Sequence, residues 1–249
     1  MLNVRSKILK RAGIRKGFSL VELSIVLIII GLLVSGISAG SALIEQSRLR
    51  SVVSDVDEYK AILNTFILTY DDLPGDMPNA HDFWGSSCDS TASKCNGDGN
   101  ERIDWGGGTD DNESLRAWQH LQLSAILSGS WDGVSSVSNS AVVEDDYPAS
   151  GLRGAGYTFT YWSGTQINVI NVGGTLVANA SVTAHNPVFL PKQLYSIDKK
   201  YDDASARTGN TIAGRLPSSP NVCWTDSSLV FNLSSGSLEC YVHFVFKKE

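Results

Sequence analysis

The stretch RKGFSLVELSIVLIIIGLLV, Arg15–Val34, decides how this chain is built. A basic pair meets a glycine, a long apolar run follows, and a single carboxylate, Glu22, stands inside that run. Glu22 is the only charged residue in 18–44, which would form about 40 Å of helix at ~1.5 Å per residue. Because that length crosses the hydrocarbon core of a bilayer, residues 18–44 are predicted to span a membrane.

Charge predicts the orientation of this helix. Residues 1–17 carry six basic residues and no acid, and positive flanking residues stay on the cytoplasmic side. The chain is therefore expected to cross the membrane once, with its N-terminus cytoplasmic and residues 45–249 outside. Two alternatives stay open. A secretory signal peptide could be cut near the small residues 36–40, and a plain signal anchor would explain the leader and the span but not Glu22.

An isolated carboxylate in a membrane span costs about 2.5–3.5 kcal/mol, and less near an interface. A charge kept at such a cost needs a partner, and the intact segment offers no cation. Cleavage between Gly17 and Phe18 would create an α-amine one helical turn from Glu22. That amine could pair with Glu22 of its own helix or of a neighbouring subunit, which would make the charge a device for register between subunits.

Gly17, Phe18 and Glu22, with the basic leader and the apolar run, resemble the leader and N-terminal helix of type IV pilins and type II secretion pseudopilins. The resemblance covers only about 30 residues of the chain. It implies that a prepilin peptidase cleaves after Gly17 and N-methylates Phe18, so that residues 1–17 are a cleaved leader. It also implies an inner-membrane precursor with residues 45–249 in the periplasm. That precursor then assembles with other pilin or pseudopilin subunits into a periplasmic or extracellular fibre.

The helical pattern continues beyond the span. Apolar residues recur at steps of three and four, which predicts one amphipathic stripe: Leu49, Val52, Val56, Tyr59, Leu63, Phe66 and Tyr70. We therefore expect one helix over residues 18–70, with a hinge near residues 36–41 as the alternative. Turn residues follow at 71–80, and a Cys-, Gly- and Asp-rich loop is expected to run to about residue 111.

A second helix is predicted over residues 112–127, with Asn112 as its N-cap. Residues 128–156 are rich in Ser and Gly and are expected to be a mobile connection. Strand patterns dominate afterwards, in segments 157–162, 167–172, 175–182, 228–233 and 238–246. The fold class is therefore α+β, and the resemblance implies a pilin-like domain over residues 45–249, with its long helix packed on an antiparallel sheet.

The four cysteines all lie beyond the apolar run, at Cys88, Cys95, Cys223 and Cys240. An even number of thiols in an exported domain indicates disulfides, for which three pairings exist. Nearest-neighbour pairing, Cys88 with Cys95 and Cys223 with Cys240, is preferred because both pairs flank turn-rich sequence. Zinc is the alternative, although the spacing contains no C-x-x-C knuckle. The resemblance adds that many pilins close a C-terminal loop in this way.

The segment NGDGNERID presents oxygen-bearing side chains around glycines, as half of a calcium loop does. Its candidate ligands are Asn96, Asp98, Asn100 and Asp104. Glu113 or Asp110 would complete the shell, and a solvated turn is the alternative. Glu101 stands where an EF-hand needs glycine, which excludes a true EF-hand. Calcium is the one cofactor expected, and major pseudopilins are known to hold calcium in such a loop region.

A second acidic segment, residues 196–209, is expected to be a loop. Its carboxylates, Asp198, Asp202 and Asp203, would bind an ion or cap local structure, and the structural role is preferred.

Charge also limits the partners. The residues beyond position 17 include 14 basic and 26 acidic side chains, a formal charge of −12. Such a body repels phosphates, so nucleic acid is not expected as a partner.

No catalytic constellation is found, and the chain is not expected to be an enzyme. The four histidines are scattered, and residues 36–40 match the hydrolase motif G-x-S-x-G only inside a predicted helix, where that motif has no strand-to-helix turn. The sequence therefore favours a structural subunit of a type IV pilus-like or type II secretion fibre. The alternatives are a minor pilin that binds through exposed tryptophans (Trp131, Trp162 or Trp224) and a membrane-anchored periplasmic enzyme.

Overall fold

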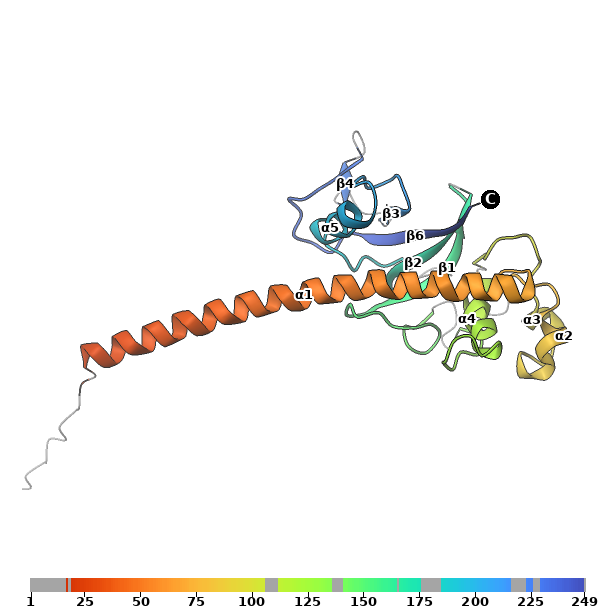
Figure 1. Cartoon of the computed structure of the whole chain (residues 1–249), viewed down its shortest axis with the longest axis horizontal. Helices are drawn as coiled ribbons and strands as arrows, with labels where there is room; N and C mark the ends of the chain where they lie inside the picture. Colours follow the sequence, from red (N-terminus) through yellow and green to blue (C-terminus); the bar gives the residue numbers. More distant parts are fainter. Residues whose placement is uncertain are drawn as a thin grey trace, which may run out of the picture. The chain divides into compact units, whose positions relative to one another are not determined.

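The computed structural model describes residues 17, 19–105, 112–135, 141–164, 166–175, 185–215, 223–225 and 229–248. The chain forms two units, residues 1–45 and residues 46–249. Figure 1 shows the order of the helices and strands along the chain.

Helix α1 (Leu20–Tyr70) is one uninterrupted helix of 51 residues, and the hinge considered near residues 36–41 does not form. Phe18, where the helix was expected to begin, lies outside the described residues. The helix ends where Asp71 adopts a φ of 62° and Pro74 follows. Gly75, with a φ of +87°, then brings the chain against the start of helix α4 (Glu113–Leu123). An added Cβ there would lie 2.2 Å from the carbonyl oxygen of Glu113, so the position requires glycine.

In the part of the chain that the structure describes, four further helices and a 3₁₀ turn follow α1. They are α2 (Ala80–Trp84), η1 (Gly85–Ser87), α3 (Ala92–Cys95), α4 (Glu113–Leu123) and α5 (Pro191–Tyr201). The predicted second helix is therefore confirmed as α4, although it ends four residues before the expected position. Asn112 precedes α4 as expected, but its side chain makes no capping hydrogen bond.

The main sheet has four antiparallel strands in the order β1-β2-β6-β3. The strands are β1 (Ala155–Trp162), β2 (Ile167–Gly174), β3 (Thr211–Gly214) and β6 (Tyr241–Lys248), and a separate two-stranded ribbon pairs β4 (Trp224–Thr225) with β5 (Val230–Phe231). The α+β, pilin-like layout predicted from the sequence, a long helix followed by an antiparallel sheet, is confirmed. The expected strand over 175–182 falls outside the described residues after position 175.

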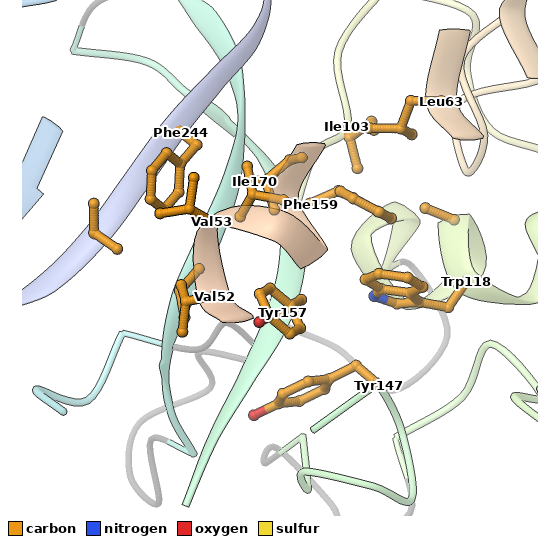
Figure 2. Packing of buried hydrophobic residues seen from close by; sticks show 14 of the residues in the cluster. Val52, Val53, Leu63, Ile103, Trp118, Tyr147, Tyr157, Phe159, Ile170 and Phe244 are labelled. Atoms are coloured by element: carbon orange, nitrogen blue, oxygen red, sulfur yellow. The ribbon is translucent and has the colours of Figure 1, made fainter. Parts of the chain in front are cut away.

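The core of the second unit lies between residues 46–70 of α1 and one face of the sheet. Figure 2 shows Val52 and Val53 of α1 beside Tyr157, Ile170 and Phe244 of the sheet. Every member of the predicted stripe from Leu49 onward packs in this core, with Tyr59 and Tyr70 partly exposed. The Tyr157 hydroxyl donates a 2.6 Å hydrogen bond to the Asp55 carboxylate, which joins the sheet to the helix.

Three segments differ from the sequence prediction. The Cys-rich loop before residue 111 contains α2, η1 and α3. Residues 141–156, expected to be mobile, bury Tyr147 completely against the core. The second acidic segment is not a loop from its start, because residues up to Tyr201 belong to α5. In each case burial of apolar side chains holds a Ser-, Gly- or Asp-rich segment in place, which local composition does not show.

Candidate functional site

The first candidate site is the start of α1. Ser19 precedes the helix, and its Oγ accepts a 3.3 Å hydrogen bond from the backbone N–H of Val21. The carboxylate of Glu22 accepts a 2.8 Å hydrogen bond from the backbone N–H of Ser19. The S-x-x-E sequence at residues 19–22 is typical of a capping box, and the Glu22 half of that motif is formed, whereas the Ser19 Oγ accepts from Val21 rather than from Glu22. Glu22 therefore has a partner in the uncleaved chain, which corrects the expectation that it has none.

Exposure distinguishes the N-terminal half of α1 from the rest of the protein. The helix is long and apolar enough to cross a membrane, and its most apolar window has no buried residue. Leu20, Leu27 and Leu32 are 84%, 69% and 70% exposed, whereas Val52 and Leu63 are fully buried. Added Cβ atoms at Gly36 and Gly40 would meet nothing within 4 Å, so these glycines leave a shallow notch for close packing of another helix.

The remaining residues of the processing motif are placed as follows. Gly17 is exposed, and Phe18 lies outside the described residues. The G-x-S-x-G match at residues 36–40 lies within α1, and the Ser38 hydroxyl donates to the carbonyl of Val34. A nucleophile elbow needs a strand-to-helix turn, so this match has no hydrolase geometry.

Both cysteine pairs are disulfides between nearest neighbours, Cys88 with Cys95 and Cys223 with Cys240. His120 lies beside the first pair, but bonded sulfurs offer no thiolate for zinc. Instead, His120 Nδ1 accepts a 2.9 Å hydrogen bond from the N–H of Gly75, and Nε2 lies 3.0 Å from the carbonyl of Cys95. Burial lowers the pKa of His120 to about 4, so the ring is neutral and joins three segments.

The second candidate site is a group of carboxylates that we name the loop cluster: Asp76, Asp98 and Glu113. Each offers an oxygen within 4.8 Å of the others. Asp76 follows α1, Asp98 follows α3, and Glu113 begins α4, so three separate segments supply the cluster. Asp76 and Glu113 are only 2% and 5% exposed.

The backbone of residues 98–104 wraps around the two buried acids. Asp76 Oδ1 accepts hydrogen bonds from the N–H groups of Gly99, at 2.8 Å, and Asn100, at 3.1 Å. The two oxygens of Glu113 accept from the N–H groups of Asp98, at 3.2 Å, and Asp104, at 2.8 Å. These donors fix the carboxylates in position and leave further lone pairs on the same oxygens.

Of the four metal ligands predicted from sequence, only Asp98 is a member of the loop cluster. Asn100 Nδ2 donates hydrogen bonds to the carboxylates of Asp98 and Asp104, which holds these two side chains together. Asn96 Oδ1 instead accepts the N–H of His81. Asp76 was missed because it is distant in sequence, whereas Glu113 was one of the two residues expected to complete the shell. Asp110, the other, lies outside the described residues.

The environment of the loop cluster disfavours the ionised form of its buried carboxyl groups. Burial, the largest cause, and neighbouring carboxylates together raise the pKa of Asp76 to about 7 and that of Glu113 to about 8. The backbone N–H donors act in the opposite direction. Carboxylates held together in this way need either protons or a cation, and their hard oxygen donors could bind a metal ion.

A third group, which we name the α5 cluster, contains Asp198, Asp202 and Asp203, again with oxygens within 4.8 Å of one another. Asp198 lies in α5, and Asp202 caps the C-terminal end of that helix. Asp198 is completely buried. This group too could bind a metal ion.

The tryptophans named as a possible binding patch do not form one. Trp131 is half-buried and packs on Trp118, with ring centroids 5.7 Å apart. Trp162 stacks on His243 at 5.0 Å, and Trp224 is 5% exposed. Rings enclosed in this way offer little surface to a partner.

Comparison with known proteins finds one match. Residues 14–38 match the family model of the prokaryotic N-terminal methylation motif, which is typical of type IV pilins and type II pseudopilins. No curated protein matches the chain, and no solved structure matches it. The match covers Gly17, Phe18 and Glu22 and ends within the exposed half of α1.

Proposed function

We propose that this chain is a structural subunit of a type IV pilus-like or type II secretion fibre, processed after Gly17 and assembled through α1. The single observation that carries the proposal is the coincidence of the methylation motif at 14–38 with a helix whose apolar side chains are exposed. A surface of this kind is stable in lipid or against other helices, but not in water. The role is structural rather than enzymatic.

The path of the subunit follows from the same features. The precursor waits in the inner membrane with residues 1–17 cytoplasmic and residues 45–249 periplasmic, since the leader is strongly basic. Removal of the leader exposes the α-amine of Phe18. Glu22 can then exchange its hydrogen bond with the Ser19 N–H for an ion pair to the amine of a neighbouring subunit. Pairing compensates a charge that is costly in lipid, so assembly becomes favourable.

Mass spectrometry of the chain from cells that contain a prepilin peptidase tests the processing step. We expect the mature protein to begin at Phe18 and to carry an added methyl group on its amine. In a Gly17→Val variant, we expect at least about 90% of the chain to retain residues 1–17, because a branched side chain replaces hydrogen at the cleaved position. Full-length protein in wild-type cells with an active peptidase contradicts the proposal.

We infer that the loop cluster holds calcium as a structural ion. Three segments supply its carboxylates, two of them are nearly fully buried, and both have raised pKa values. A divalent cation would replace the protons that these acids otherwise retain, and calcium accepts the irregular oxygen geometry of loops.

The pH dependence of stability tests the loop cluster, using the full chain in detergent with a chelator. Because the folded pKa values of Asp76 and Glu113, about 7 and 8, exceed those of the unfolded chain, their contribution to stability is lost as pH rises. We expect Tm to fall by at least about 5 °C between pH 5 and pH 8.5, and calcium chloride to restore it most strongly at the higher pH.

The matched variants for this experiment are Glu113→Gln, which removes one buried charge, and Glu58→Gln, which removes an exposed one from α1. Glu113→Gln should flatten the pH profile and reduce the effect of calcium, whereas Glu58→Gln should change neither. Equal calcium responses in the two variants would show that calcium acts elsewhere.

A further inference from the structure

We propose that the α5 cluster is a second cation site, which takes a hard divalent cation, calcium, between Asp198 and the loop that follows α5. The proposal is independent of the fibre assignment and of the loop cluster. It rests on the environment of Asp198.

Within the part of the chain that the structure describes, Asp198 is a buried acid without a hydrogen-bond partner. Its side chain is 0% exposed, and neither carboxylate oxygen has a donor within reach. An unpaired buried carboxylate is costly, so such groups are normally hydrogen-bonded, ion-paired or bound to a metal. An oxygen of Asp198 lies within 4.8 Å of oxygens from both Asp202 and Asp203, so it faces two further acids instead of a donor.

The position of the cluster on α5 adds to the cost. Asp198 and Asp202 are four residues apart, one helical turn, at the C-terminal end of the helix. The carbonyls at that end carry partial negative charge, which disfavours carboxylates and favours cations. Three acids are therefore unfavourably placed at this end of the helix, and a positive charge among them would compensate that cost.

The nearby basic side chains do not compensate Asp198. Lys199 and Lys200 place their ammonium groups over the rings of Tyr195, at 5.7 Å, and Tyr201, at 5.2 Å. The Arg207 guanidinium stacks on two tryptophans and donates to the carbonyl of Ala213. Lys60 of α1 acts electrostatically on Asp202, and neither oxygen of Asp198 receives a hydrogen bond from it.

The loop after α5 holds the other two carboxylates in fixed positions. Asp202 Oδ2 accepts from the N–H groups of Asn210 and Thr211, at 2.5 Å and 2.6 Å. Asp203 accepts from the Ser205 N–H at 2.9 Å and from the Thr208 hydroxyl. Each carboxylate oxygen has two lone pairs, so these oxygens can accept a hydrogen bond and coordinate a cation together.

Gly209 allows this loop to close. Its φ is +75°, and an added Cβ would lie 2.2 Å from Asp202 Oδ2. Any other residue would displace that carboxylate, so the loop conformation and the position of Asp202 depend on each other. The three acids are therefore held together by the fold before an ion arrives, which lowers the entropic cost of binding.

Calcium fits this donor set better than other cations. All three side-chain donors are carboxylates, which suits hard cations and not zinc or copper. Three carboxylates supply only part of a shell of 6–8 oxygens, so water would supply the rest, and calcium tolerates irregular shells better than magnesium does. Burial and the charges of Asp203 and Asp202 raise the pKa of Asp198 to about 7, so protons compete with the ion below that pH.

Thermal unfolding of the full chain in detergent at pH 8 tests the proposal, with calcium chloride, magnesium chloride or chelator. Four proteins are compared: wild type, Asp198→Asn, Glu113→Gln and the double variant. In chelator, Asp198→Asn should melt higher than wild type, because it removes an uncompensated buried charge. Calcium should raise the Tm of Glu113→Gln by about 5 °C or more and should change that of the double variant by less than about 1 °C.

Gly209→Ala provides a second variant, which leaves Asp198 in place but displaces Asp202. Combined with Glu113→Gln, it should lose the remaining calcium response, while Glu58→Gln combined with Glu113→Gln retains it. The proposal is overturned if Glu113→Gln and the double variant respond equally to calcium. It is also overturned if Asp198→Asn lowers Tm equally with and without calcium, because Asp198 is then a protonated structural acid. A larger response to magnesium than to calcium overturns the choice of calcium.

Discussion

Fibre formation is expected to fall on the order of 100-fold when Glu22 is replaced by alanine. An unpaired carboxylate costs about 2.5–3.5 kcal/mol in a membrane span, and pairing with a neighbouring subunit's amine would relieve that cost. Alanine has no charge to compensate, so transfer of the helix from lipid into the fibre loses this favourable free energy. Sheared or secreted fibres, quantified against membrane-bound subunit, measure the effect. Leader cleavage should remain unchanged, because Gly17 and Phe18 are intact, and the Tm of the body should remain unchanged, because Glu22 lies in the other unit.

The variant Glu22→Gln distinguishes the role of the Glu22 charge in assembly from its role in capping α1. Glutamine keeps an oxygen that can accept the Ser19 N–H, so it preserves the Glu22 half of the capping box seen in the structure while removing the charge. We expect this variant to assemble as poorly as the alanine variant. Ser24→Ala, which removes only a hydroxyl bonded to the Val21 carbonyl, should assemble normally. Normal fibres from Glu22→Gln would assign the role of Glu22 to capping and contradict the ion-pair mechanism.

Trp118→Ala is expected to destabilise the body by about 3–5 kcal/mol, a large share of the free energy of unfolding of an ordinary domain. Trp118 is completely buried and stacks on Phe159 with ring centroids 4.2 Å apart. Its edge contact to Tyr59, at 5.1 Å, connects α4 to α1. Alanine would leave a cavity where three elements meet. Denaturant unfolding of the full chain in detergent, followed by circular dichroism, measures the change.

Two variants make this result specific. Trp118→Phe keeps most of the ring volume and removes an indole N–H that has no hydrogen-bond partner, so it should cost less than about 1.5 kcal/mol. Trp105 is 45% exposed, and its replacement by alanine should change stability by less than about 0.5 kcal/mol. Surface substitutions change the free energy of unfolding by about 0.5 kcal/mol or less. If Trp118→Ala lowers the free energy of unfolding by less than about 1 kcal/mol, the core does not depend on this ring.

The fold was predictable where the hydrophobic period was long. Steps of three and four from Leu49 to Tyr70 predicted the buried face of α1, and alternation in residues 157–162 predicted β1. Helix α5 was missed although Pro191 at its first turn and the apolar Leu194 and Ile197 signal a helix start. The acidic residues that follow are typical of a loop, so the sequence predicted one. Burial of Leu194 and Ile197 stabilises the helix instead.

The candidate sites were predictable only in part. Asp98 and the possible role of Glu113 followed from spacing, because these residues share one loop region. Asp76 could not be predicted, because it reaches the cluster through the turn at Gly75 and the packing of α4 on that turn. The lack of a hydrogen-bond donor for Asp198 among the described residues could not be predicted from the sequence either. Whether a carboxylate finds a donor depends on every element around it, and no local pattern records that.

The central place of β6 has a consequence for synthesis. This strand, residues 241–248, lies between β2 and β3, and it is the only strand of the main sheet that pairs with β3. A nascent or truncated chain that stops before residue 241 leaves β2 with a bare edge and β3 without a neighbour, and such edges invite aggregation. The main sheet can therefore close only after residues 241–248 have been synthesised.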